Sequence, residues 1–481
     1  MVEILARSLA TVLGIVGTSF VLPVLVAWWY GEYRDIPGFA VPMAASWATA
    51  GWFWLRGRGK AKVGGVQNAF VIVGSAWVAI SLFGAIPLYV CGAFPNFADA
   101  LFESASGFTT TGASVISDVE SLPKCINFWR CQTHWLGGMG VIALAVALIP
   151  ILGIGGYRLV QAETSGPEKG KLTSRISDTA KILWAIYFVL TMLQAALLHW
   201  FGMGWFDAVC HAFSTLGTGG FSTRNASLAS FASPALEWIC LSFMLLASVN
   251  FGIYFLLLSG RWRDVCENTE LRGFAFIVLG AVAGVTAVEW MQFGAFDDAL
   301  RHSAFQVASV ISTTGFMSND YTTWLPAAQL LVLTLFFVGG CSGSTAGGIK
   351  VIRWSVLAKQ LRNDVQRLIH PHGVFTLRIN GVPGRSEVVS VVGSFIFVYF
   401  VLVLVTALAG ALAGLDVYTS FTAALSMVGN IGPAFGSLGP ASNYGALPGP
   451  LKLWYCFAML AGRLEVYTLL ILVGRSLPRR K

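Results

Sequence analysis

Long apolar segments constrain the fold of this chain more than any other feature of its sequence. A helix of about 20 mostly apolar residues can cross the roughly 30 Å hydrocarbon core of a bilayer. Ten such segments occur, at approximately 8–30, 36–55, 67–93, 127–153, 181–201, 235–259, 273–293, 324–358, 388–413 and 449–474. Only 11% of the 481 residues are charged, whereas soluble domains have about 25%. The chain is therefore predicted to be an all-α integral membrane protein surrounded by lipid.

The basic residues predict the topology. The net charge of +8 comes mostly from short clusters of Lys and Arg between apolar segments, such as 56–62 and 479–481. This is the positive-inside pattern of membrane proteins, so nucleic acid is not expected as a partner. The pattern places 56–66, 157–181, 260–272, 350–387 and the C-terminus in the cytoplasm. The segment 8–30 is too long for the apolar part of a signal peptide and is expected to remain as a transmembrane helix.

Four moderately apolar segments are too short to cross the membrane and end in clusters of Gly, Thr and Ser. They begin at Phe97, Phe206, Phe296 and Leu415. Near the start of each lies an aspartate, namely Asp99, Asp207, Asp298 (or Asp297) and Asp416, which is expected to cap the free N–H groups of a short helix. A glycine follows 12 to 17 residues later. We predict half-helices that enter from outside and stop midway.

The spacing of these glycines indicates an internal repeat. Gly112, Gly219, Gly315 and Gly432 are 107, 96 and 117 residues apart, and each lies between two long apolar segments. The predicted unit is span, half-helix, glycine-rich stretch, span. The chain is accordingly divided into a two-helix extension (1–60) and four repeats (61–165, 166–265, 266–385 and 386–481).

The stretches that end at the four glycines are predicted to form an ion-selectivity filter. Extended backbone cannot face lipid but can line a water-filled path, where rings of carbonyl oxygens replace the hydration shell of a monovalent cation. Glycine permits the backbone angles that expose those carbonyls. A single Gly/Thr cluster is usually only loop punctuation, but four at matching places favour a filter. The predicted filter residues are Thr110, Thr111, Gly112, Gly217, Thr218, Gly219, Thr313, Thr314, Gly315, Asn430, Ile431 and Gly432.

With these four units and an extra N-terminal pair of spans, essentially the whole chain resembles the Trk/Ktr/HKT superfamily of potassium transporters, and within it the bacterial TrkH type. The resemblance implies pseudo-fourfold symmetry of the repeats around a central pore. It also implies a homodimer in the bacterial inner membrane, seated on a cytosolic nucleotide-binding ring of the TrkA kind. Glycine at position 112 goes with potassium selectivity in this superfamily. Potassium is then the substrate, and no cofactor is expected.

A second glycine-rich stretch, 339–348, interrupts the apolar segment 324–358. Five glycines in ten residues disfavour a straight helix, and an interrupted membrane helix needs a packed or water-lined setting. Two other readings are a phosphate-binding loop, although the Gly-Lys-Ser/Thr order is missing, and a kink for helix packing. In TrkH-type relatives the matching loop is a gate. The implied gate residues are Gly340, Cys341, Ser342, Gly343, Ser344, Thr345, Gly347, Gly348, Lys350 and Arg463.

Several charged residues have two readings. Arg463 lies in the last apolar segment, where a charge is costly. One expectation is that its charge lies near the permeation path below the gate loop. The other is structural, in which it forms a salt bridge or its side chain reaches the inner face of the membrane. Glu103 is expected to brace the filter rather than bind the ion. The basic stretch that contains Arg353, Lys359, Arg362 and Arg367 is expected to be cytosolic charge and a docking region for a regulatory partner.

Other classes of function fit the sequence less well. No carboxylate pair, nucleophile triad or ATP motif is visible, so the chain is not expected to be an enzyme. The main alternative is a proton- or sodium-coupled symporter, which usually has buried Asp, Glu or Lys in its spans. The eight cysteines form no metal-binding pattern, and a disulfide between Cys125 and Cys131 stays open. His370 and His372 are expected to be solvated. Asp118, Glu120 and Asp320 are expected to draw cations to the outer mouth.

Overall fold

The computed structural model describes residues 2–57, 65–151, 176–383 and 386–465. Within them all regular secondary structure is helical apart from one short hairpin, which confirms the predicted all-α fold. The helices that build the predicted spans and the arm after the glycine-rich loop are α1 (Val2–Ser19), α2 (Val21–Trp29), α3 (Ile36–Arg56), α4 (Gly65–Val90), α6 (Lys124–Ile151), α8 (Ile176–Trp200), α10 (Pro234–Ser248), α11 (Phe251–Leu258), α13 (Thr269–Phe293), α15 (Pro326–Leu335), α16 (Val351–Ile369), α17 (Ser386–Leu412) and α19 (Gly449–Arg463). A short helix, α12 (Trp262–Glu267), precedes α13.

Not every predicted span is a single apolar helix. Among the described residues, five stretches are long and apolar enough to cross a membrane, and the bent pair α10–α11 makes a sixth. The five are Leu5–Trp29, Val71–Val90, Ala180–Trp200, Thr269–Phe293 and Val388–Leu412. Residues 466–474 of the last predicted segment lie outside the described residues. The remaining segments are interrupted or carry buried polar side chains.

The segment 235–259, expected to be one span, is broken. α10 and α11 meet at an angle of 92°. The side chain of Asn250 accepts a hydrogen bond from the Gly252 N–H at 2.7 Å and so caps α11. The Phe251 N–H donates to the carbonyl of Gly343 at 3.1 Å. The break therefore satisfies its backbone groups with a cap and with the glycine-rich loop 339–348.

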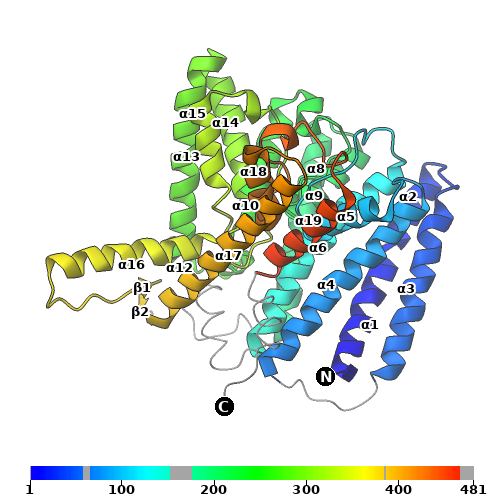
Figure 1. Cartoon of the computed structure of the whole chain (residues 1–481), viewed down its shortest axis with the longest axis horizontal. Helices are drawn as coiled ribbons and strands as arrows, with labels where there is room; N and C mark the ends of the chain where they lie inside the picture. Colours follow the sequence, from blue (N-terminus) through cyan, green and yellow to red (C-terminus); the bar gives the residue numbers. More distant parts are fainter. Residues whose placement is uncertain (1, 58–64, 152–175, 384–385, 466–481) are drawn as a thin grey trace.

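The segment 324–358 is broken at that same loop. α15 ends at Leu335 and α16 begins at Val351. α16 does not continue the line of α15 but leaves the body of the molecule as an arm that runs crosswise to α13 (Figure 1). The arm returns through the antiparallel hairpin of β1 (Arg378–Ile379) and β2 (Val382–Pro383).

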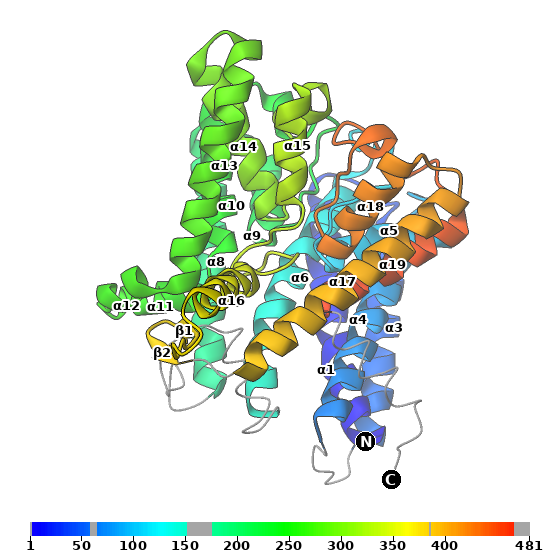
Figure 2. The ribbon, with the colours of Figure 1, turned by 60° about the vertical axis from the view of Figure 1, so that its left-hand side comes forward.

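Four short helices occupy the places of the predicted half-helices, and we call them the pore helices. They are α5 (Phe97–Phe108), α9 (Trp205–Leu216), α14 (Phe296–Ile311) and α18 (Val417–Gly429). All are largely buried. In both views they lie in the upper part of the molecule, above the α16 arm and its hairpin (Figures 1 and 2).

The prediction that an aspartate caps each pore helix is right for only one of them. Asp416 is the N-cap of α18, and its side chain accepts from the Thr419 N–H at 2.9 Å. The other three helices begin earlier, so their aspartates lie in the first turn. There the carboxylates pair with basic side chains, Asp99 with Lys452 at 2.6 Å, Asp207 with Arg224 at 3.0 Å and Asp298 with Arg301 at 2.8 Å.

The two N-terminal spans pack against α4 and α6. α1, α3 and α4 lie side by side in both views (Figures 1 and 2). Phe20 and Phe39 contact Trp129 of α6, with ring centroids 4.7 and 6.5 Å from that of Trp129. Trp129 lies in turn 6.0 Å from Phe108, at the end of pore helix α5. The extension thus supports the helix behind the first glycine-rich stretch.

Lys452 joins the last long helix to the first pore helix. It is buried, and besides Asp99 its ammonium group donates to the carbonyl of Gly445 at 2.8 Å. α19 packs along α5 at this point. The pair therefore ties α19 to α5, two helices that lie far apart in the sequence.

We expect Lys452→Met to leave Asp99 without its cation and to lower the free energy of unfolding in detergent by about 3–5 kcal/mol. The double variant Asp99→Asn/Lys452→Met should recover part of that loss, because no uncompensated charge remains. Unfolding temperatures of the purified proteins provide the measurement. Equal loss in the single and double variants would contradict this role.

Candidate functional site

All four pore helices end in the same backbone turn. A residue in the left-handed region follows each helix, namely Thr110 (φ 55°), Thr218 (55°), Thr313 (55°) and Asn430 (54°). Two residues later comes a glycine with positive φ, namely Gly112 (78°), Gly220 (82°), Gly315 (77°) and Gly432 (98°). Such angles are uncommon for residues other than glycine. The four turns are therefore structurally equivalent, and we call 109–112, 217–220, 312–315 and 429–432 filter segments 1 to 4.

Hydrogen bonds within the turns confirm this alignment. The residue before each glycine donates its N–H to the carbonyl of a serine in the pore helix. The pairs are Thr111 to Ser106 (2.8 Å), Gly219 to Ser214 (2.8 Å), Thr314 to Ser309 (2.9 Å) and Ile431 to Ser426 (2.9 Å). A serine thus occupies the same place in every pore helix.

The alignment of Gly219 with the other three filter glycines is wrong by one residue. Gly220 is the structural equivalent of Gly112, because the two share the positive φ and the distance from the helix end. Filter segment 2 contains consecutive glycines at 219 and 220, and matching the pair Thr-Gly selects the first of them. Backbone angles, which a sequence does not display, distinguish the two.

The four filter segments form a closed ring. A β-carbon on Gly112 would lie 1.8 Å from the carbonyl oxygen of Gly219, and one on Gly220 would lie 1.9 Å from that of Thr314. A β-carbon on Gly315 would lie 2.3 Å from the Ile431 oxygen, and one on Gly432 2.4 Å from the Thr111 oxygen. Each glycine therefore lies against the carbonyl of the next segment, and the last segment meets the first.

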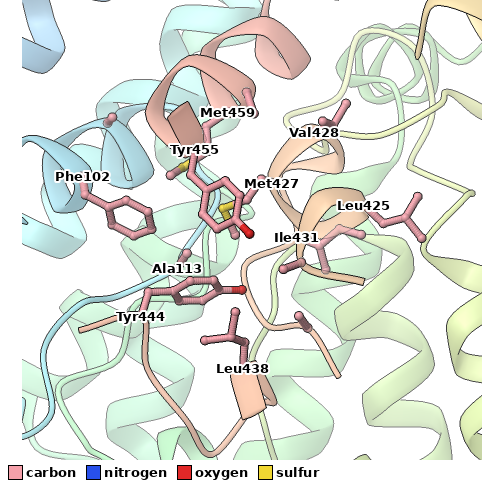
Figure 3. Close-up of a cluster of buried hydrophobic side chains, with 14 of the residues drawn as sticks. Phe102, Ala113, Leu425, Met427, Val428, Ile431, Leu438, Tyr444, Tyr455 and Met459 are labelled. Carbon is pink, nitrogen blue, oxygen red and sulfur yellow. The ribbon is translucent and has the colours of Figure 1, made fainter. Parts of the chain in front are cut away.

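Filter segment 4 is held by side chains that surround it (Figure 3). The hydroxyl of Tyr444 donates to the Gly432 carbonyl at 2.8 Å, and the Tyr444 N–H donates to the Ser114 carbonyl at 2.8 Å. The amide of Asn430 donates to the hydroxyl of Thr111 at 2.9 Å. These bonds join segment 4 to segment 1, so this junction is built from polar contacts of side chains.

Glu103 and Arg130 form a buried ion pair behind segments 1 and 2, with 2.7 Å between the guanidinium and the carboxylate. Glu103 also accepts from the Ser114 hydroxyl at 2.9 Å and from the Val115 N–H at 3.0 Å. The Arg130 guanidinium lies 4.3 Å from the centroid of the Phe221 ring. The pair thus connects the extended stretches that follow both filter segments, in agreement with the bracing role expected of Glu103.

The glycine-rich loop 339–348 lies against the inner ends of the pore helices. The Thr345 hydroxyl donates to the Leu216 carbonyl at the end of α9, at 2.9 Å. The Gly347 N–H donates to the Thr313 hydroxyl at 2.6 Å. A β-carbon on Gly347 would lie 2.4 Å from the Gly429 carbonyl oxygen. The loop therefore contacts the last residues of α9 and α18 and the turn that follows α14.

Two buried basic side chains hold the loop. The Arg463 guanidinium donates to the Thr345 carbonyl at 2.7 Å, and the Lys350 ammonium donates to the Ala346 carbonyl. This contact places the Arg463 side chain beside the loop. It favours that expectation over the alternative in which the side chain reaches the inner face of the membrane. Glu270, which no sequence pattern singles out, also holds the loop, because its Oε1 accepts from the Ser342 N–H at 2.7 Å and from the Ile352 N–H at 3.2 Å.

Arg353 differs from the other basic residues of the cytosolic stretch. Although it belongs to the stretch expected to be cytosolic charge and a docking region, its side chain is only 2% exposed. It pairs with Glu465 at 2.6 Å and lies 3.7 Å from the centroid of the Phe395 ring. It lies in the first turn of α16, where the chain leaves the packed body, and the apolar stem and planar head of arginine suit such a place. His370 and His372 are exposed as expected.

The acidic residues of the outer loops are engaged in local contacts. Asp118 accepts from the Asn225 amide at 2.8 Å, and Glu120 lies 3.6 Å from Arg224. The hydrogen bond from Asn225 holds the pKa of Asp118 below its usual value. Asp320 caps a short 3-10 helix by accepting from the Thr322 N–H at 2.9 Å. The contacts of Asp118 and Glu120 join two outer loops, whereas the contact of Asp320 lies within one loop.

The described residues contain no group of three His, Cys, Asp or Glu side chains placed to hold a metal ion. Cys125 and Cys131 are buried as free thiols, so the disulfide left open by the sequence is absent. Sequence reasoning missed Arg130, His134, Glu270 and Tyr444 as neighbours of the filter or loop. Each of them is a polar residue within or beside an apolar segment. This feature is visible in the sequence, but it does not show which residue the side chain contacts.

We expect Glu103→Gln to leave the Arg130 guanidinium buried beside a neutral partner and to destabilise the fold by about 3–5 kcal/mol. Asp364→Asn, at an exposed ion pair of α16, is the control, because such pairs contribute about 0–1 kcal/mol. The measurement is thermal unfolding in detergent. Similar unfolding temperatures for the two variants would contradict the bracing role.

Comparisons with known proteins agree with this architecture. Residues 39–481 match the TrkH family model, described as a cation transport protein. The chain is 38% identical to the Trk system potassium uptake protein TrkH of Halomonas elongata, over 98% of both chains. Its identity to the Escherichia coli K12 protein of the same name is 37%, over 97% of this chain and 98% of the relative. The crystal structure of the potassium transporter TrkH from Vibrio parahaemolyticus superposes with a TM-score of 0.89 at 33% identity, covering 98% of each chain. The chain therefore belongs to the TrkH family of cation transport proteins.

Proposed function

We propose that this protein takes up potassium across the cytoplasmic membrane through a pore lined by the four filter segments. The observation that carries the proposal is the closed ring, in which each filter glycine lies against a carbonyl of the next segment. The names of the relatives, which are potassium uptake proteins and a potassium transporter, support the choice of ion.

The chemistry of such a ring suits a monovalent cation. Carbonyl oxygens on neighbouring segments replace the water that an ion loses on entry. Gly112, Gly220 and Gly315 are half-buried, while the residues before them (Thr111, Gly219 and Thr314) are buried, so the backbone of these glycines is the part left open to an ion. The pore helices end at the ring, and the negative ends of their dipoles favour a cation there. The membrane potential adds about 2.3 kcal/mol per 100 mV of inward drive for each charge.

The proposed potassium-binding residues are those predicted from the sequence, with one addition. They are Thr110, Thr111, Gly112, Gly217, Thr218, Gly219, Thr313, Thr314, Gly315, Asn430, Ile431 and Gly432, together with Gly220. Rejection of sodium rests in this proposal on holding the ring at a fixed width, and the contacts behind each segment supply that support.

The loop 339–348 is the proposed gate. Its hydrogen bonds to Leu216 and Thr313 support a position across the path just below the ring. An ion that leaves the filter then requires the loop to move. Arg463 and Lys350 hold the closed position through the Thr345 and Ala346 carbonyls.

The repeat boundaries at 61, 166, 266 and 386 remain part of the proposal, as do the assembly and the location. We propose a homodimer in the bacterial inner membrane on a cytosolic nucleotide-binding ring of the TrkA kind. The relatives' description as parts of a Trk system supports a regulatory partner. The α16 arm leads directly from the gate loop and projects from the body (Figure 1), so a partner that moved α16 would move the gate.

Ion-coupled symport is the alternative, and one buried carboxylate bears on it. Glu289 of α13 is fully buried, which coupled transporters often require. Its Oε1 accepts from the Leu325 N–H at 3.1 Å just before α15 begins. This contact gives Glu289 a structural task in joining α13 to α15. Uptake driven by voltage alone separates the two mechanisms.

We expect liposomes that contain the purified protein to take up rubidium when only a membrane potential drives it, with no proton or sodium gradient. Failure of uptake under these conditions, with the gate held open by the partner or by mutation, would contradict the channel-like mechanism.

We expect Gly315→Ser to lower the preference for potassium over sodium by about tenfold or more, because the new side chain would crowd the Ile431 carbonyl. Gly280→Ser is the matched control, since Gly280 has ordinary φ and open space around it. Competition of sodium against rubidium uptake in liposomes provides the measurement. Unchanged preference in Gly315→Ser would falsify the filter assignment.

We expect Arg463→Gln to raise rubidium flux severalfold, because the loop loses a charge-assisted hydrogen bond to Thr345, which is worth roughly 1.5–3 kcal/mol. Arg362→Gln, on an exposed face of α16, should leave the flux unchanged. Lower flux in Arg463→Gln with normal folding would argue against a closing role.

A further inference from the structure

The residue before the filter glycine differs in one segment. Thr111, Thr314 and Ile431 occupy this position in segments 1, 3 and 4, whereas segment 2 has Gly219. Gly219 is not among the residues with positive φ, so its backbone angles would suit any residue. Gly220 beside it has φ 82° and needs to be glycine on that ground alone. Something other than backbone conformation excludes a side chain at 219.

The imidazole of His134 occupies the space that a side chain at 219 would need. A β-carbon on Gly219 would lie 2.3 Å from both Cγ and Nδ1 of His134 and 2.6 Å from Cδ2. These ring atoms are the nearest to that position, in contrast to Gly220, whose β-carbon would meet the backbone of segment 3. His134 is fully buried.

α6 holds the ring against segment 2. Gly137 and Gly138 follow His134 at the spacing of one helix face, and both lie in close contact with the pore-helix ends. A β-carbon on Gly137 would lie 1.9 Å from the Phe108 carbonyl oxygen, and one on Gly138 would lie 2.9 Å from the Cα of Gly217. This close approach sets the depth of the His134 ring between segments 1 and 2.

The ring of His134 contacts segment 2 and the stretch after it, on both sides of Gly220. It stacks on Phe221 with centroids 4.1 Å apart and an interplanar angle of 20°. The Phe221 N–H donates to Nδ1 at 3.4 Å, which leaves the proton of the neutral ring on Nε2. Among the described residues Nε2 has no hydrogen-bond partner. The shape of the ring and its Nδ1 atom therefore make the contacts.

We propose that His134 is a positioning residue of the filter. Its ring fills the space beside segment 2 that the side chains of Thr111, Thr314 and Ile431 fill in the other three segments. The ring sets the position of the Gly219 carbonyl, which lies against Gly112 in the closed ring. This inference rests on the proposed function and deepens it, because it assigns the spacing between segments 1 and 2 to a side chain from α6.

A double-mutant cycle tests the inference through rescue. The variants are Gly219→Ala, His134→Ala and their combination, each purified and reconstituted in liposomes. Gly219→Ala alone should lower the preference for potassium over sodium by about tenfold, because the new methyl group overlaps the ring. In the double variant the ring is absent and the methyl group fits, so the preference should exceed that of Gly219→Ala alone.

The matched control is Gly220→Ala with and without His134→Ala. Here the obstacle is the Thr314 carbonyl at 1.9 Å and the positive φ, so removal of the ring should rescue nothing. The inference is overturned if Gly219→Ala behaves as the unmodified protein, if the double variant is no better than Gly219→Ala, or if His134→Ala rescues Gly220→Ala equally well.

Unfolding temperatures in detergent extend the test to variants that transport poorly. The same coupling between positions 134 and 219, and its absence between 134 and 220, should appear in these temperatures, or in the yield of folded protein where a variant is too unstable to measure. Absence of the coupling there overturns the inference. Failure of the proposed function has a different signature, in which Gly315→Ser keeps its preference for potassium while the 134–219 coupling in stability persists.

Discussion

The close approach of four backbone segments is the constraint on which the rest of the structure depends. At each filter glycine a β-carbon would lie only 1.8–2.4 Å from a carbonyl oxygen of the next segment. Backbones this close leave no room for side chains at the contact. Their unpaired N–H and C=O groups cannot face lipid. The pore helices bring the segments to the centre, and the long helices around them exclude the lipid.

The junctions between segments are supported in different ways. The Glu103–Arg130 pair and His134 lie behind segments 1 and 2. Tyr321 donates to the Ala434 carbonyl at 2.9 Å and so holds the stretch that follows segment 4. Tyr444 and Asn430 join segment 4 to segment 1. The backbone turns of the four segments thus follow nearly fourfold symmetry, whereas the side chains that support them differ from segment to segment. A change at one support should therefore alter the ring on one side.

The sequence predicted the elements of the fold but not their contacts. Apolar length revealed the helices, and the four Gly/Thr clusters revealed the pore helices, because both are local patterns. The equivalence of Gly220 to the other filter glycines is visible only in the backbone angles. The aspartates other than Asp416 pair with basic side chains, and the partner of Asp99, Lys452, lies far along the chain. The break between α10 and α11 depends on Asn250 and on a loop about 90 residues later. These features are set by tertiary contacts, which hydropathy and spacing do not encode.

The central claim is that a monovalent cation binds within the ring formed by the four filter segments. Anomalous diffraction from crystals grown with rubidium or thallium tests it most directly. The account predicts an anomalous peak on the axis enclosed by the carbonyls of Thr111, Gly219, Thr314 and Ile431, and loss of that peak when sodium replaces the heavier ion. An empty ring in transport-competent protein, with the ion bound elsewhere among the helices, would contradict it.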